Sequence, residues 1–115
     1  MQEGDVVLTP VPQADGTVKN RPAIVLREMP VYRDVLVCGV STQLHQYVPG
    51  FDDLIAPADA DFAASGRVAP SLSRLGFLAV VPRRNLPGTI GAIAPERHKR
   101  LLQALSNYLL RNLGS

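Results

Sequence analysis

The sequence contains no tryptophan and a single cysteine, Cys38. One cysteine excludes an internal disulfide framework. With only two histidines, His45 and His98, which lie far apart in the chain, it does not predict a metal site. No apolar run approaches the roughly 18 residues that a membrane helix needs, and the acidic Glu3 and Asp5 do not fit a basic leader segment. We therefore expect a cytoplasmic protein with no metal, no other cofactor and no membrane contact.

Aromatic residues are also scarce, at 5% of the chain. If the protein stacks nucleic-acid bases on aromatic side chains, the candidates are Tyr32, Tyr47 and Phe51. The aromatic surface that they predict is small.

What the chain does contain is typical of one globular domain, residues 1–115, with 46% apolar and 19% charged residues. Its net charge of +2 is unevenly distributed. Through Asp61 there are four basic and nine acidic residues, whereas from Phe62 onward eight basic residues face only Glu96. A basic half can attract nucleic acid or an acidic protein segment, although solvated surface charge is the commoner explanation.

Short apolar segments separated by glycine and proline predict six or seven strands. They cover residues 4–9, 23–26, 34–40, 53–56, 68–72, 75–81 and 88–93. Residues 10–20 predict a long loop, and residues 58–65 one helical turn ended by Gly66. The segment 34–40 is apolar on both faces and should be central, with Gly39 marking a bulge or a close backbone approach. This pattern favours a small barrel or sandwich.

The end of the chain is helical in pattern. Pro95 suits the first helical position, and leucines from Leu101 onward recur at helical spacing until Gly114. We expect an amphipathic helix packed on the barrel, with its arginines and His98 near or on the solvent side. Those arginines are Arg97, Arg100 and Arg111.

The stretch KNRPAIVL begins with a cationic pair and ends as an apolar strand. Pro22 lacks an N–H and should be the first residue of that strand. It also biases Arg21 toward an extended backbone. Arg21 is therefore the first candidate for a functional residue.

Three separated segments together resemble the MazF/PemK growth-inhibitor toxins. GDVVLTP followed by a loop and KNRPAIVL is similar to the start of that family, and GVSTQ is similar to its strand that ends in a hydroxyl residue before glutamine. APSLSRLGFLAV and then GTIGAI are similar to its later strands. The resemblance implies a small SH3-like β-barrel with a C-terminal amphipathic α-helix, usually a homodimer. It also implies a toxin of a type II toxin–antitoxin system: a metal-independent, sequence-specific endoribonuclease that cleaves single-stranded mRNA and is inhibited by an antitoxin with an acidic flexible tail.

The resemblance assigns the cleaving pair to Arg21 and a hydroxyl residue, either Ser41 from its place in the strand or Thr42 from its residue type. The residues that it suggests for RNA contact are Lys19, Gln43, His45, Ser71 and Arg74. Cleavage by attack of a ribose 2′-OH on the adjacent phosphorus requires RNA and builds charge on phosphoryl oxygens that a guanidinium can stabilise. Arginine is a poor base because it stays protonated, so Arg21 is expected to stabilise charge or donate a proton, and the base is left open.

Two other functions fit the same fold. One is a non-catalytic toxin that acts by protein contact; relatives of that kind use a tryptophan near the C-terminus, which this chain lacks. The other is a degenerate member that only binds its antitoxin and represses transcription with it. DNA would then be contacted only through the antitoxin complex.

Overall fold

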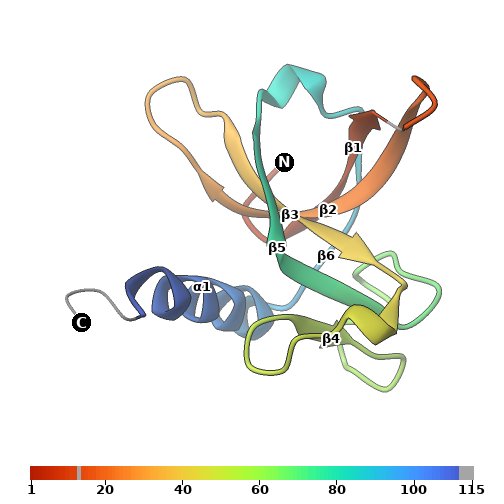
Figure 1. The fold of residues 1–115 in the computed structure, drawn as a ribbon, viewed down its shortest axis with the longest axis vertical. Coiled ribbons are helices and arrows are strands. Elements are labelled where there is room, and N and C mark those ends of the chain that lie inside the picture. Colours follow the sequence, from red (N-terminus) through yellow and green to blue (C-terminus); the bar gives the residue numbers. More distant parts are fainter. Residues whose placement is uncertain (13, 112–115) are drawn as a thin grey trace.

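The computed structural model describes residues 1–12 and 14–111. Within these ranges the chain forms six strands, one α-helix and two short 3-10 helices (Figure 1). The strands are β1 (Asp5–Pro12), β2 (Val18–Glu28), β3 (Val35–Ser41), β4 (Asp53–Ile55), β5 (Ser71–Val81) and β6 (Gly88–Ala92); the helices are η1 (Leu44–Gln46), η2 (Arg83–Asn85) and α1 (Pro95–Leu110). The mainly β fold with a C-terminal helix is confirmed. The predicted stop at Gly114 lies outside the described residues.

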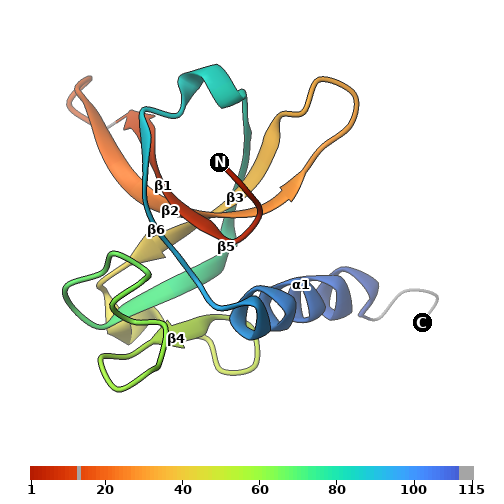
Figure 2. The same cartoon turned by 180° about the vertical axis from the view of Figure 1, so that it is seen from behind.

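The strands form one antiparallel sheet in the order β4-β5-β3-β2-β1-β6. The sheet curls into a half-barrel, which Figure 2 shows from behind. β3 lies between β5 and β2, so its predicted central place is confirmed. Cys38 in β3 is buried, and this burial raises the pKa of its thiol to about 12. It is a core residue, as expected.

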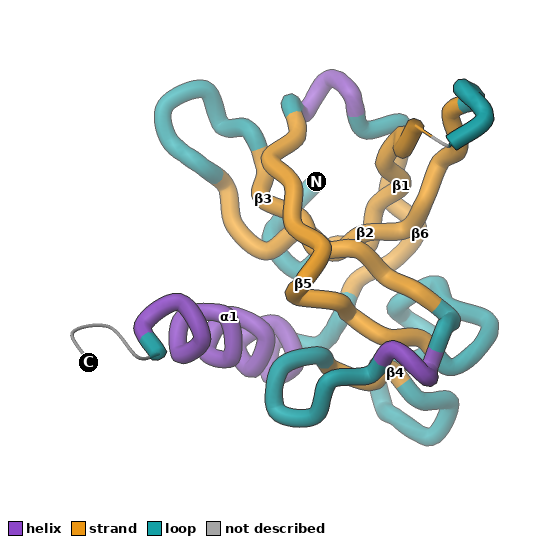
Figure 3. Tube along the Cα trace, in the orientation of Figure 1, coloured by secondary structure: helices purple, strands orange, loops and turns teal. Residues whose placement is uncertain are grey.

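The two faces of the sheet carry separate apolar clusters because side chains alternate along a strand. Val6 and Val7, adjacent in β1, belong to different clusters. The larger cluster includes Leu101 and Leu105 of α1 together with Val6, Ile24, Leu26, Cys38, Val40, Ile55 and Leu75; Figure 3 shows the helix beside the sheet. The smaller cluster, on the other face, consists of Val7, Ala23, Val25, Val35 and Val37. The helix thus covers one face of the sheet. On the other face, the apolar cluster is formed by residues of the curled sheet itself.

The prediction of a long loop at residues 10–20 is wrong. β1 continues to Pro12 and β2 already begins at Val18, so the two strands form a long hairpin. Pro22 lies within β2, paired with Leu8, and is not the first residue of the strand. The pairing of β2 with β3 begins at Ala23, so one side of β2 is an edge at Pro22. A strand tolerates proline at an edge because a missing N–H costs least there.

The two strands predicted at residues 68–72 and 75–81 are one strand, β5. The register between β3 and β5 shifts between Cys38, which pairs with Leu78, and Gly39, which pairs with Arg74. The irregularity predicted at Gly39 is therefore confirmed. A close approach is present as well, because a β-carbon on Gly39 would lie 2.8 Å from Cδ1 of Phe77.

α1 begins at Pro95, as predicted, and buries Leu101 and Leu105. The expectation that Arg97 and His98 face solvent is wrong. Arg97 is 5% exposed, and Nε2 of His98 lies 2.7 Å from the carbonyl oxygen of Leu26. In the part of the chain that is described, no helix has both the length and the apolar character to cross a membrane.

Candidate functional site

A groove of about 930 Å³ lies on the sheet face opposite α1. Strand residues from β1, β2, β3 and β5 line it, together with the segment after β3. The polar and charged residues among them are Thr9, Arg21, Ser41, Thr42, Gln43, Gln46, Arg67, Arg74 and Asn85. Most of the catalytic and RNA-contacting residues suggested by the sequence thus meet at one surface.

Arg21 and Ser41 reach the groove for the same geometric reason. Ala23 of β2 pairs with Gly39 of β3, and the strands are antiparallel. Arg21 and Ser41 each lie two residues beyond that pair, toward the same end, and residues two apart in a strand share a face. The hydroxyl oxygen of Ser41 accepts a hydrogen bond of 3.0 Å from the amide of Gln43, which fixes the start of the turn after β3.

Thr42 follows directly after β3, is exposed, and also lines the groove. Both hydroxyl candidates therefore reach the surface that carries Arg21. Gln43 lines it too. Lys19 is exposed on β2 and His45 on η1, but neither belongs to the lining of the groove.

Ser71 is fully buried, so the structure gives no surface for the direct RNA contact suggested for it. Its hydroxyl oxygen instead accepts a 2.9 Å hydrogen bond from Nε of Arg67 and donates one of 2.9 Å to the carbonyl of Ala69. Arg67 lines the groove, and sequence reasoning missed it. The signal available was its place four residues before Ser71, within the basic half of the chain.

Phe77 is the aromatic residue that lines the groove, and it is 52% exposed. The three aromatic candidates from the sequence, Tyr32, Tyr47 and Phe51, do not line it; Phe51 packs against Tyr108 at a ring distance of 4.8 Å. Phe77 lies in the part of β5 where the register shifts beside Gly39; the sequence predicted an irregularity at Gly39 but did not indicate that Phe77 would line the groove.

Much of the basic half is neutralised by the acidic half. Three arginines of the second half form ion pairs with carboxylates of the first: Arg83 with Glu28, Arg100 with Asp53, and Arg97 with three aspartates. Among the described residues, the groove arginines Arg67 and Arg74 have no such carboxylate partner. Arg67 and Arg74 therefore bring positive charge to the groove that no carboxylate of the described chain neutralises.

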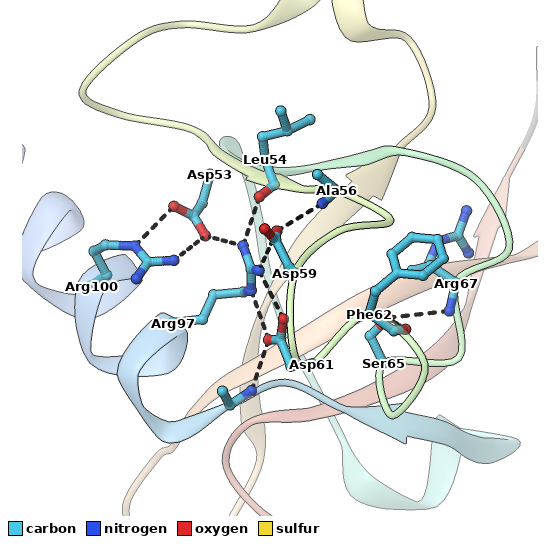
Figure 4. Close-up of polar contacts among 11 residues, drawn as sticks. Asp53, Leu54, Ala56, Asp59, Asp61, Phe62, Ser65, Arg67, Arg97 and Arg100 are labelled. Carbon is cyan, nitrogen blue, oxygen red and sulfur yellow. Dashed lines mark hydrogen bonds and ion pairs between the residues drawn. The ribbon is translucent and has the colours of Figure 1, made fainter.

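Arg97 anchors a polar cluster away from the groove (Figure 4). Its guanidinium contacts Asp53, Asp59 and Asp61 at 2.6 to 2.8 Å and also donates to the carbonyl of Leu54. These contacts join the start of α1 to the segment that contains β4. The cluster positions that segment and provides no groove surface.

The fold is similar to a solved structure, the Mycobacterium tuberculosis toxin MazF-mt6, with a TM-score of 0.64 and 20% sequence identity, over 91% of this chain and 95% of that one. At this identity the likeness establishes the fold class of a MazF toxin. The family model described as PemK-like, MazF-like toxin of type II toxin-antitoxin system matches residues 2–109. The chain therefore belongs to the PemK/MazF family of type II toxin–antitoxin toxins. No curated protein sequence matches the chain.

Proposed function

We propose that this toxin is a metal-independent, sequence-specific endoribonuclease that cleaves single-stranded mRNA and thereby stops translation and growth. The observation that carries the proposal is the groove: Arg21 from β2 and the adjacent Ser41 and Thr42 at the end of β3 line it together. Arg67 and Arg74 line the same surface, and these two form no ion pair with a carboxylate of the described chain. A guanidinium beside hydroxyl groups suits a phosphate under attack.

In the proposed reaction the ribose 2′ oxygen attacks the adjacent phosphorus, and the bond from phosphorus to the 5′ oxygen breaks. The 2′-OH loses its proton and the leaving 5′ oxygen gains one, so the products are a 2′,3′-cyclic phosphate and a 5′-hydroxyl end. Arg21 stabilises the charge that builds on the phosphoryl oxygens and can protonate the leaving oxygen. The Ser41 or Thr42 hydroxyl positions the phosphate.

The test is cleavage of mixed-sequence RNA by the purified protein in EDTA. Arg21→Ala should lower the cleavage rate by about a hundredfold or more, because one preorganised donor to the transition state is lost. Ser41→Ala and Thr42→Ala, measured side by side, identify the hydroxyl that contributes. Arg84→Ala is the matched control, since Arg84 is exposed and lies outside the groove lining.

Intact RNA in the presence of folded wild-type protein, freed of any antitoxin, would contradict the nuclease. That result would favour a non-catalytic toxin of the same fold. End-mapping of the fragments tests sequence specificity, because an unspecific nuclease would give no shared bases around the cut sites.

We further propose a cytoplasmic toxin that forms a homodimer and is inhibited by an antitoxin with an acidic flexible tail. Large apolar side chains outside the groove lining remain exposed on β5 and the last turn of α1, including Leu78, Leu109 and Leu110. They offer surface to a second copy. Light scattering should give twice the chain mass of 12.4 kDa at micromolar concentration; a single-chain mass there would contradict the dimer.

A further inference from the structure

The side chain of Arg67 is held in an unusual environment for a surface arginine. It is partly buried, and burial alone lowers the pKa of its guanidinium from the ordinary value. Its Nε donates to the buried hydroxyl of Ser71, which fixes the plane of the group. A guanidinium remains charged under these conditions, so the structure carries a desolvated cation that lacks a carboxylate partner among the described residues.

The side chain of Arg74 also lacks interaction partners among the described residues, which is seen independently at its Nε atom. Its Nε is buried and has no hydrogen-bond partner within the described structure. Arg74 lies three residues after Ser71 on β5 and pairs with Gly39, where the ring of Phe77 takes the place that a side chain would need. Leaving a buried donor unsatisfied is costly. No hydrogen bond or ion pair within the described structure engages the rest of the guanidinium, which lines the groove and can bind a ligand there.

We propose that Arg67 and Arg74 form a second phosphate-binding subsite of the groove, which holds a backbone phosphate of the RNA next to the one attacked beside Arg21. This inference rests on the proposed nuclease function and adds to it. Ser71 acts as a positioning residue, because it contacts Arg67 and not the ligand. The subsite would fix the path of the RNA strand relative to Arg21 and the two hydroxyl residues.

A phosphate fits these two residues for three reasons. Guanidinium groups bind phosphate oxygens in a planar, bidentate manner. Both arginines line the same groove as Arg21, so a strand that places one phosphate at Arg21 can continue past them. In the part of the chain that the structure describes, the lining of the groove includes no aspartate or glutamate that would repel the ligand.

The direct test measures binding of a mixed-sequence 2′-O-methyl RNA 12-mer, which cannot be cleaved because the attacking hydroxyl is blocked. Arg67→Gln and Arg74→Gln should each weaken binding about tenfold, since each removes charge-assisted hydrogen bonds. Arg67→Lys keeps the charge but loses the planar fork, and should recover only part of the loss. Arg84→Gln, which removes a charge outside the groove, should bind as the wild type does.

The positioning role of Ser71 is tested by a double-mutant cycle. Ser71→Ala should weaken RNA binding less than Arg67→Gln does, and it should add nothing in the Arg67→Gln background. A merely structural effect of Ser71→Ala would instead be the same in both backgrounds.

A second measurement changes the RNA, and its main comparison uses only the wild-type protein. Once the cut site has been mapped, substrates are made with a neutral methylphosphonate at each linkage flanking it in turn. One flanking linkage should show an approximately tenfold loss of binding with wild-type protein, and Arg67→Lys should be less sensitive at the same linkage. Equal effects at all flanking linkages would overturn the subsite.

The outcomes separate the two proposals. If Arg67→Gln and Arg74→Gln bind RNA as Arg84→Gln does while cleavage still depends on Arg21, the subsite is wrong and the nuclease stands. If both variants lose RNA binding but no protein cleaves RNA, the nuclease is wrong and the groove remains an RNA site. If they lose binding to a polyglutamate 12-mer and keep binding to RNA, the subsite serves an acidic protein segment, and the proposal is overturned.

Discussion

At Asp61, three hydrogen bonds converge on one carboxylate. Two come from the guanidinium of Arg97, at 2.8 Å each, and one of 2.9 Å comes from the amide of Ala94. The bonds from Arg97 lower the pKa of Asp61 to about 2 and outweigh the opposite effect of burial. The ionised carboxylate is therefore the form that the folded state prefers.

This preference predicts an acid-dependent loss of stability. The unfolded chain has the ordinary aspartate pKa of about 3.9. Because the folded-state pKa is lower, Asp61 stabilises the fold fully above about pH 4, and this contribution disappears as the pH falls from 4 toward 2. It amounts to on the order of 2 kcal/mol. Urea unfolding between pH 6 and pH 2 measures the loss.

Asp61→Asn is the matched variant, since its amide oxygen can still accept from Ala94 but carries no charge. It should lose less stability between pH 4 and pH 2 than the wild type, by about the amount given above. Equal losses in the two proteins would show that Asp61 is not the source.

Arg97 also shows what residue-level sequence reading can miss. It precedes Leu101 by four residues and Leu105 by eight, so it lies on the same helical stripe as these two buried leucines. Its residue type led us to expect a solvent-exposed side chain, although its place on the buried stripe fits the burial that the structure shows. The three carboxylates that make this burial tolerable lie 36 to 44 residues away in the chain, which no local pattern reveals.

Among the elements, α1 depends on this cluster more than on its exposed ion pair. Arg97→Met should lower the free energy of unfolding by about 3 kcal/mol, because it leaves three partly buried carboxylates without the charge of a buried arginine. Arg100→Met removes an arginine of the same helix that also contacts Asp53 but is 55% exposed. It should cost no more than about 1 kcal/mol. Similar losses for the two variants in denaturant unfolding would refute this ranking.

The contact between β6 and the turn before β5 is equally testable. A β-carbon on Gly91 would lie 2.4 Å from the carbonyl oxygen of Ala64, at a place where Ala92 donates a hydrogen bond to that oxygen. These are backbone atoms that cannot move without breaking the contact. Gly91→Ala should therefore destabilise the protein by about 2 kcal/mol or more.

Gly88 is the control in the same strand. A β-carbon there meets nothing within 4 Å, so Gly88→Ala should leave the stability unchanged or raise it by up to about 1 kcal/mol. Thermal unfolding of both variants tests this difference. Equal melting temperatures would show that the backbone at Ala64 can shift to accommodate a β-carbon at Gly91.

How far the sequence predicts these elements depends on the range of the contacts involved. Apolar segments bounded by glycine and proline located β3 and β6, and leucines at helical spacing located α1, because these signals are local in the sequence. They failed for the β1–β2 hairpin, where Pro10 and Pro12 suggested a loop but pair with Asn20 and Val18 of β2. They also divided β5 in two, since the shifted register beside Gly39 is set by the partner strand. Arg67 was missed because its place in the groove depends on residues of other strands and on its hydrogen bond to Ser71.

At the scale of the whole molecule, the division into an acidic and a basic half does not describe the surface. The ion pairs of Arg83, Arg97 and Arg100 join the two halves. The chain carries a net charge of only +2, so overall charge gives a weak attraction for RNA. Binding should instead depend on the few cations that line the groove.

The salt dependence of RNA affinity measures this directly. For a single strand, the slope of log affinity against log salt is about −0.7 for each phosphate neutralised. With Arg21, Arg67 and Arg74 in the groove, binding of the 2′-O-methyl RNA to one groove should give a slope of about −2. Replacing any of the three by glutamine should make the slope shallower by about 0.7. Lys99→Gln, on the exposed side of α1, should leave it unchanged; an equal change there would mean that the surface as a whole, and not the groove, holds the RNA.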